Sequence, residues 1–176
     1  MVVGNRNSRL SSCQKTRKED RMPFAFSFVK VKHIGLVVPD LNASMAAASQ
    51  LLGLGAFRVI EPEAFEAPPY YEKKYRGSDE DFAFRCAYAP MGPLEIEFIQ
   101  PVKGKTVYDD FLRETGGGLH HFAIEVQDLE RELERMVAAG GAVIQSAKRT
   151  GLSWAYVELG SLNGLVLELI QPKVAG

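Results

Sequence analysis

The sequence has few cysteines and no long apolar run, and both shortages restrict what the protein can be. Cys13 and Cys86 are the only cysteines, too few for the disulfide framework of a small secreted domain. No apolar stretch approaches the roughly 20 residues that a membrane-spanning helix needs. No segment resembles a secretory signal. We therefore expect no membrane partner and a reducing, cytoplasmic environment.

An excess of one charge is also missing. The formal net charge is −1, and the main body has no basic stripe interleaved with aromatic residues. A nucleic-acid partner is therefore not expected. The start of the chain is rich in Ser and Arg and lacks periodicity, which predicts a disordered tail over residues 1–27 before an ordered domain at 28–176. Its acid-poor beginning resembles a mitochondrial presequence, so a mitochondrial location is the alternative to the cytoplasm.

What the chain does contain is an internal repeat. The segment "KHIGLVVPDLNASM" aligns with "HHFAIEVQDLEREL", which matches His33 with His121. The segment "PLEIEFIQP" aligns with "GLVLELIQP", which matches Glu97 with Glu168. Two copies are too few for a solenoid and suit two modules that close on each other.

Each copy has the pattern of a β-α-β-β-β unit, which predicts an α+β fold of two paired βαβββ modules. Module one covers residues 30–101, a connecting helix covers 102–117 and module two covers 118–173. Each predicted helix follows a residue type that favours a helix N-cap. These capping residues are Asp40, Thr106 and Asp128.

The polar residues of the repeat stand where apolar residues are expected. Alternation along a strand places Glu97 and Glu168 on the face opposite their leucine and isoleucine neighbours. A buried carboxylate has to be paired, protonated or bound to a metal. A single histidine at a strand start is usually structural, but His33 and His121 recur at equivalent places. If a pseudo-two-fold axis relates the modules, these four side chains converge on one point as ligands of a divalent first-row metal.

Only one residue of the adjacent pair His120 and His121 has a counterpart in the first module. Successive strand residues point to opposite faces, so His121 is expected to share the concave face with His33. His120 is then expected to face the helical layer or the rim, with a structural role.

The pattern "HIGLVVPDL…GLG…IEFIQP…FLRETGGGLHHFAIEVQDL…LELIQP" resembles the vicinal oxygen chelate superfamily, which includes glyoxalases, bleomycin resistance proteins and extradiol dioxygenases. Within it, the chain is most similar to methylmalonyl-CoA epimerases and related glyoxalase-like proteins. The resemblance implies an open, cup-shaped mixed sheet with helices on its outer face and a divalent cation (Co, Ni, Zn, Mn or Fe) inside. The implied ligands are His33, Glu97, His121 and Glu168.

The resemblance also implies a metal-dependent isomerase that epimerises an acyl-CoA of the methylmalonyl type through an enolate. Glu168 and Glu97 are then the candidate catalytic bases, with Glu168 preferred. The first alternative is a glyoxalase I-type lactoylglutathione lyase with the same ligands. An iron oxygenase fits less well because its site needs only one carboxylate. A non-catalytic small-molecule binding protein of the same fold is the last alternative. The expected partners are an acyl thioester and, since members often dimerise, a second copy of the chain.

The segment "EPEAFEAPPYYEKKYRGSDED" is longer and more aromatic than a plain epimerase requires. We expect Tyr70, Tyr71 and Tyr75 to lie in a loop over the mouth of the cup. Arg85 stands where some epimerases carry a second catalytic glutamate, which suggests an anionic group on the substrate; alternatively, Arg85 pairs with a nearby acid. Arg85, Tyr75 and Trp154 form the expected substrate-binding set.

Overall fold

The computed structural model describes residues 27–62 and 70–172. Apart from residue 27, the predicted tail lies outside the described residues. The helices and strands follow one another along the chain as β1 (Lys30–Val37), α1 (Leu41–Leu52), β2 (Arg58–Ile60), β3 (Tyr71–Tyr75), β4 (Ser78–Asp79), β5 (Ala83–Met91), β6 (Leu94–Lys103), α2 (Val107–Thr115), β7 (Gly118–Glu125), α3 (Leu129–Ala138), β8 (Ala142–Arg149), β9 (Leu152–Leu159), a 3-10 turn (Gly160–Leu162) and β10 (Leu165–Pro172). Over these residues, no helix is long and apolar enough to cross a membrane.

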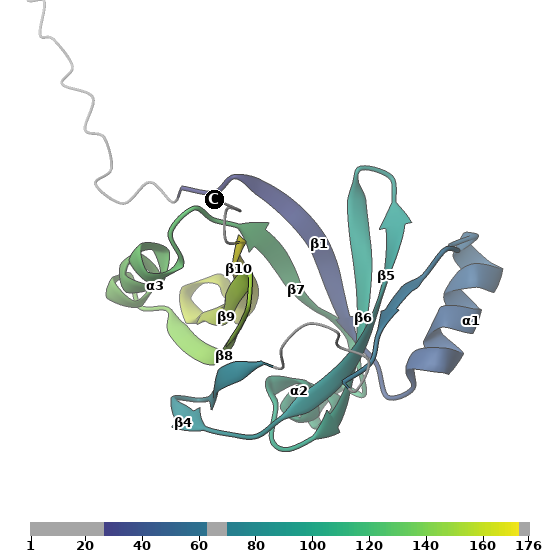
Figure 1. Cartoon of the computed structure of the whole chain (residues 1–176), viewed down its shortest axis with the longest axis horizontal. Helices are drawn as coiled ribbons and strands as arrows, with labels where there is room; N and C mark the ends of the chain where they lie inside the picture. Colours follow the sequence, from purple (N-terminus) through teal and green to yellow (C-terminus); the bar gives the residue numbers. More distant parts are fainter. Residues whose placement is uncertain (1–26, 63–69, 173–176) are drawn as a thin grey trace, which may run out of the picture.

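One mixed sheet of ten strands curls into a half-barrel (Figure 1). The strand order is β2-β5-β6-β1-β7-β10-β9-β8-β3-β4. Pairs β1–β6 and β7–β10 are parallel, and the other neighbouring strands are antiparallel. At the centre, β1 and β7 pair so that His33 lies opposite Ala123 and Gly35 opposite His121. The residues of the sequence repeat therefore exchange places about a pseudo-two-fold axis, which confirms the predicted pair of βαβββ modules in a cup.

Among the described residues, two of the three α-helices cover the outer face of the cup, as expected. Asp40 caps the start of α1, where its side chain accepts a hydrogen bond from the Ala43 amide, and Asp128 caps α3 in the same way. Helix α1 packs on an apolar cluster of β5 and β6, and α3 packs on one of β9 and β10. These two clusters hold the convex side of the sheet.

Helix α2 lies on the inner side. It has the predicted capping box of Thr106 and Asp109, and its first two residues, Val107 and Tyr108, are almost completely buried. Tyr108 belongs to the apolar cluster inside the cup, together with Trp154 and other aromatic residues. The connection between the modules thus fills one end of the cup with side chains.

The described part of the long insertion in module one forms a hairpin of β3 and β4. Strand β3 leaves module one and pairs antiparallel with β8 of module two, with Tyr75 opposite Gln145. Strand β4 then forms the outer edge of the sheet. Residues 63–69, in which part of the predicted loop falls, lie outside the described residues. The insertion therefore joins the free edge of module two to module one.

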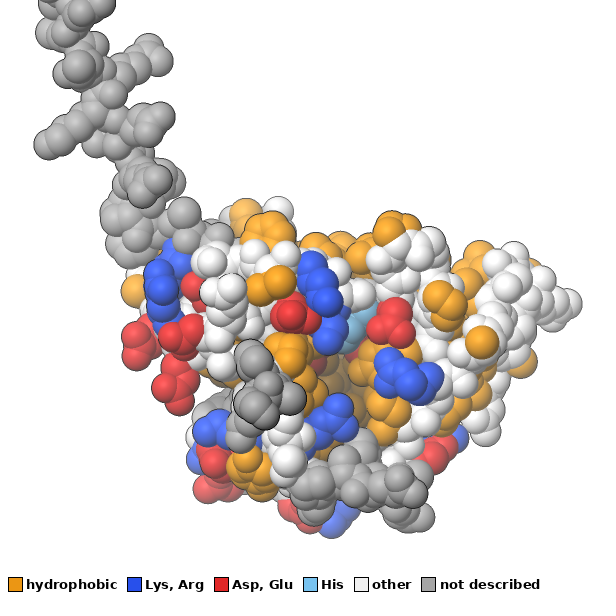
Figure 2. All heavy atoms as spheres, turned by 45° about the horizontal axis from the view of Figure 1, so that its top comes forward, with side chains coloured by type: hydrophobic (Ala, Val, Ile, Leu, Met, Phe, Trp, Pro, Cys, Tyr) orange, Lys and Arg blue, Asp and Glu red, His pale blue; other side chains and the backbone are white. Residues whose placement is uncertain are grey.

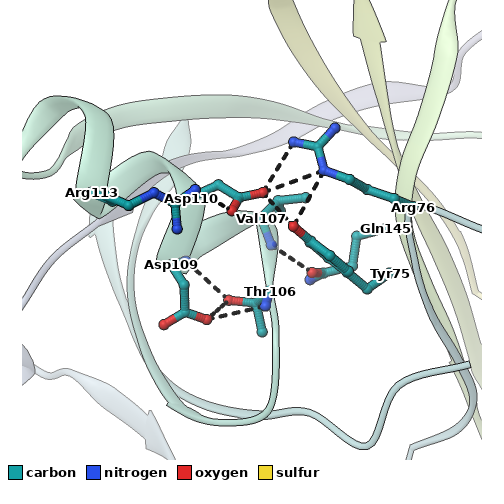
Figure 3. A network of polar contacts seen from close by, with 8 residues as sticks. All are labelled: Tyr75, Arg76, Thr106, Val107, Asp109, Asp110, Arg113 and Gln145. Carbon is teal, nitrogen blue, oxygen red and sulfur yellow. Dashed lines mark hydrogen bonds and ion pairs between the residues drawn. The ribbon is translucent and has the colours of Figure 1, made fainter. Parts of the chain in front are cut away.

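A polar network connects this hairpin to α2 (Figure 3). The Tyr75 hydroxyl donates a 2.7 Å hydrogen bond to Asp110 Oδ2, and Arg76 Nη2 lies 3.0 Å from the same oxygen. The Val107 amide donates a 2.9 Å hydrogen bond to Gln145 Oε1. The hairpin, β8 and α2 are therefore tied together at the closed end of the cup.

Candidate metal centre

The four repeated polar residues converge at the centre of the sheet. His33, Glu97, His121 and Glu168 come from β1, β6, β7 and β10, which are neighbours in the sheet. Their exposed fractions are 3%, 3%, 1% and 7%. One nitrogen or oxygen of each lies within 4.8 Å of the others. Such a group of buried imidazoles and carboxylates is the donor set that first-row divalent cations favour.

The distances within the group point to a shared centre. His33 Nε2 lies 2.9 Å from Glu97 Oε2 and 3.0 Å from Glu168 Oε2. His121 Nε2 lies 3.4 Å from His33 Nε2 and about as far from both carboxylates. Glu168 Oε2 is buried and accepts no well-oriented hydrogen bond, despite the nearby imidazole. A buried carboxylate oxygen without such a partner, beside two imidazoles and a second carboxylate, suits a metal ligand, so the residues fit a divalent cation.

The electrostatics of the four residues lead to the same conclusion. Burial would lower the pKa of His33, but the carboxylates of Glu97 and Glu168 raise that pKa to about 10. The same carboxylates raise the pKa of His121 against the effect of burial. Burial would raise the pKa of each glutamate, but the two imidazoles hold both below their ordinary value. In the metal-free protein, the protons on the two imidazoles balance the negative charge of the two carboxylates. A bound cation would replace these protons, so metal binding would release protons.

A β-bulge corrects the prediction that alternation separates His120 from His121. The pairing of β1 with β7 passes from Gly35 opposite His121 directly to Leu36 opposite Leu119. His120 is therefore an extra residue of β7, and strict alternation fails at this point. The Nδ1 atoms of the two histidines lie 3.0 Å apart.

His120 contacts the inner helix α2, and not the outer helical layer that strict alternation predicted. Its ring centroid lies 5.0 Å from that of Phe111 and 5.8 Å from that of Tyr108. Burial, with the neighbouring His121, lowers the pKa of His120 to about 3, so the ring is neutral. The first module has a matching bulge at Lys32, just before His33.

Gly35 provides the space that the His121 ring occupies. A Cβ added to Gly35 would lie 1.9 Å from His121 Cε1 and 2.3 Å from its Nε2. The position related to Gly35 by the repeat is Ala123, where a methyl group is accommodated next to His33. The site therefore requires glycine at one of these two positions.

Two tyrosines that sequence reasoning missed flank the centre. Tyr88 on β5 pairs with Glu97, and Tyr156 on β9 pairs with Glu168. The rings lie 5.5 Å from that of His33 and 4.8 Å from that of His121, respectively. The internal repeat could have revealed these tyrosines, since the segments "CAYAP" and "WAYVE" carry the same Ala-Tyr pair in equivalent strands of the two modules.

A cavity of about 120 Å³ opens onto the centre. Its described lining includes the cationic residues Lys32, Arg58 and Arg149, which sequence reasoning also missed, and the aromatic residues Tyr70 and Trp154. Figure 2 shows the hollow, with basic and acidic side chains around its rim and a histidine visible inside. The composition suits a ligand with negative charges and an apolar part.

The predicted substrate-binding residues lie in three different places. Trp154 lines the cavity. Tyr75 is tied to Asp110 at the closed end of the cup. Arg85 is not among the described residues that line the cavity. Its Nε and Nη2 atoms donate hydrogen bonds of 2.7 and 2.6 Å to the Glu61 carboxylate. Arg85 therefore pairs with a nearby acid, which was the alternative prediction for this residue. Tyr70 lies against Trp154, with ring centroids 6.0 Å apart. That its loop closes over a bound ligand stays a prediction.

Comparison with known proteins agrees with this fold. A family described as the Glyoxalase/Bleomycin resistance protein/Dioxygenase superfamily matches residues 32–157. A mitochondrial methylmalonyl-CoA epimerase of Dictyostelium discoideum is 22% identical over 144 residues, which cover 80% of this chain and 76% of the relative. An ethylmalonyl-CoA/methylmalonyl-CoA epimerase of Cereibacter sphaeroides is 23% identical over 147 residues, which cover 81% and 97%.

The solved structure of a methylmalonyl-CoA epimerase variant from Streptomyces coelicolor in complex with 2-nitronate-propionyl-CoA superposes with a TM-score of 0.61 at 18% identity. The superposition covers 84% of this chain and all of that one, and at this identity it shows a common fold. Family match, paired modules and shared fold lead to one assignment: the chain belongs to the glyoxalase/bleomycin resistance protein/dioxygenase superfamily.

Proposed function

We propose that this protein is a metal-dependent epimerase of an acyl-CoA thioester that carries a second carboxyl group, of the methylmalonyl type. One observation carries the proposal: two buried carboxylates flank a buried imidazole pair at the base of a cavity lined by cationic side chains. Epimerases of methylmalonyl-CoA and ethylmalonyl-CoA among the relatives support the substrate class.

The proposed metal ligands are His33, Glu97, His121 and Glu168. A divalent cation bound there would act as a Lewis acid that polarises a substrate oxygen and stabilises the negative charge that develops on it, which contributes several kcal/mol. The protein itself keeps the ligands buried and directed at one point. It also keeps both carboxylates ionised, since their pKa values are lowered.

The carboxylates are the proposed groups that move the proton. Epimerisation requires removal of a proton from one face of the carbon next to the thioester carbonyl and delivery of a proton to the opposite face, so the two carboxylates are the proposed groups for the two faces. Glu168 is the preferred acceptor: it would leave the cation to take the proton, and its side chain is more exposed than that of Glu97, 10% against 4%. A positioned general base of this kind contributes roughly 10²–10⁴-fold to a rate.

The cations of the cavity are the proposed recognition elements. Lys32, Arg58 and Arg149 provide positive charge for the substrate carboxylate and the phosphates of coenzyme A. Arg58 also lies over the Tyr88 ring, 4.3 Å from its centroid, which orients the guanidinium. The aromatic wall around Trp154 would exclude water from the acidic carbon.

Deuterium incorporation tests the proposal directly. The metal-loaded protein is incubated in D₂O with each enantiomer of methylmalonyl-CoA, and the label at the acidic carbon is measured by mass spectrometry. We expect incorporation together with conversion of one enantiomer into the other. Absence of incorporation for methylmalonyl-CoA, ethylmalonyl-CoA and their close analogues would refute the proposed reaction.

The runner-up is a lyase of the glyoxalase I type, because two imidazoles and two carboxylates suit that chemistry as well. The same protein is therefore assayed with methylglyoxal and glutathione. Formation of S-lactoylglutathione without exchange in acyl-CoAs would favour the lyase. Tight binding of methylmalonyl-CoA or S-lactoylglutathione without turnover would favour a non-catalytic binding protein.

A further inference from the structure

His120 stands in contact with the candidate metal centre but outside its ligand group. The bulge of β7 brings its Nδ1 to 3.0 Å from His121 Nδ1, while His121 Nε2 faces His33 and the two carboxylates. The His121 ring is therefore in contact through both nitrogens, one directed to the centre and one to His120.

The chemistry of imidazole determines how such a pair shares its protons. A neutral imidazole that offers Nε2 to a cation carries its proton on Nδ1. His121 is 1% exposed, so water does not reach this N–H, and an unpaired buried donor is unfavourable. The acceptor at hydrogen-bond distance is His120 Nδ1, which must then have a free lone pair, with the proton of the His120 ring on Nε2.

We propose that His120 is the positioning residue of the metal centre: its Nδ1 accepts the hydrogen bond of His121 Nδ1 and thereby holds His121 in the tautomer that binds a cation. This inference rests on the proposed metal site and not on the proposed reaction. Metal-binding histidines generally donate their second N–H to a partner that fixes the ring, and loss of that partner weakens metal binding about 10- to 100-fold.

Three aromatic rings surround the His120 ring. Phe111, Tyr108 and Tyr156 surround it with ring centroids 5.0, 5.8 and 5.6 Å away. His120 also lines a second cavity, of about 460 Å³, beside α2. Truncation to alanine would let water enter from this cavity and replace the lost acceptor, so a test needs substitutions that keep the volume.

His120→Leu and His120→Asn form such a pair. Leucine keeps the branched shape without an acceptor, whereas the Asn amide oxygen takes a position similar to that of the histidine Nδ1. Phe111→Leu is the matched control, since it disturbs the same aromatic surroundings and leaves the Nδ1 pair intact. The readouts are the dissociation constants for Zn²⁺ and Co²⁺, measured by chelator competition, and the visible absorption of the Co²⁺ form.

We expect His120→Leu to bind both ions about 10- to 100-fold more weakly, with an altered Co²⁺ spectrum. His120→Asn should recover most of the affinity, and Phe111→Leu should remain close to wild type. Ring ¹⁵N NMR of the Zn²⁺ form should show the His120 proton on Nε2. Wild-type affinity in His120→Leu, equal losses in His120→Leu and Phe111→Leu, no recovery in His120→Asn, or a proton on His120 Nδ1 would each overturn the inference. A wild-type protein that binds no divalent ion would instead refute the metal site itself.

Discussion

The two modules provide the same proposed metal ligands but surround them differently. Module one precedes the proposed ligand His33 with Lys32, which lines the cavity, and module two precedes the proposed ligand His121 with His120, which contacts α2. Both residues are the extra residue of a β-bulge, so the backbone is symmetrical where the side chains are not. The repeat therefore builds the centre, and its departures from symmetry determine which side opens to a ligand.

The inner helix has no counterpart in the repeat and explains much of this difference. Helix α2 brings Tyr108 and Phe111 to the His120 side, and the Tyr108 hydroxyl shares a 2.9 Å hydrogen bond with that of Tyr156. On the Lys32 side, the cavity that opens onto the centre is lined by charged residues, Lys32, Arg58, Arg149 and Glu95, as well as by aromatic rings. One half of a nearly symmetrical site is thus packed against α2 through aromatic rings, and the other opens to a cavity with charged walls.

The largest expected effect separates the two glutamates. Glu168→Gln should lower deuterium exchange into methylmalonyl-CoA by roughly 10²–10⁴-fold, since an amide does not accept the proton, while its oxygen still coordinates a cation. Glu97→Gln should lower exchange less if Glu97 acts mainly as a ligand. Exchange is measured on both enantiomers of methylmalonyl-CoA. If Glu168→Gln impairs exchange of one enantiomer and Glu97→Gln impairs exchange of the other, each glutamate is the base for one stereoisomer. If both metal-loaded variants exchange at the wild-type rate, neither glutamate is the base.

The next effect separates Gly35 from Ala123. Gly35→Ala should displace the His121 ring, destabilise the fold by about 1–3 kcal/mol through overpacking and weaken Zn²⁺ binding. Ala123→Gly adds freedom to a strand and removes one buried methyl group, and should cost about 1–2 kcal/mol with little change in Zn²⁺ affinity. Thermal unfolding and chelator competition measure both quantities. Equal Zn²⁺ affinity in the two variants would contradict the asymmetry.

A third effect concerns the pH dependence of the metal-free protein. The folded-state pKa of His33 is about 10 and its ordinary value is 6.5, so the folded state holds a proton that the unfolded chain releases between these values. This contribution to stability is complete below pH 6.5 and is lost as the pH rises through about 10, at about 1 kcal/mol per pH unit. The lowered pKa values of Glu97 and Glu168 give a contribution that is lost on acidification below their ordinary value of 4.5. Urea unfolding at several pH values measures this dependence. His33→Gln should reduce the decrease in the free energy of unfolding between pH 6.5 and about 10.

The smallest effect concerns the tie between the hairpin and α2. Tyr75→Phe removes the hydrogen bond to Asp110, which also pairs with Arg76, and should lower the free energy of unfolding by about 1 kcal/mol. Zn²⁺ affinity should not change, because Tyr75 is absent from the ligand group. The neighbouring Tyr71, which is 42% exposed, is the control, and Tyr71→Phe should leave stability near wild type.

Local signals and the repeat were enough to predict the helix caps, the two modules and the convergence of the four polar residues. Three features depend on how strands pair, and sequence periodicity carries no information about them. The bulge at His120 adds one residue to a strand without any change in its hydrophobic pattern. The face of Arg85 follows from the register that places Tyr88 opposite Glu97. The pairing of β3 with β8 joins segments about 70 residues apart, which no short-range pattern indicates.

The crossing of β3 has a consequence for how the chain can be divided. A break in the connection at Gly116–Gly118 would appear to separate the two repeats, but the first fragment would still carry the strand that pairs with β8 of the second. Each fragment would expose an unpaired edge at β3 or β8, in addition to those at β1 and β7. The two halves are therefore suited to fragment complementation and not to independent folding, and metal binding would report their reassembly.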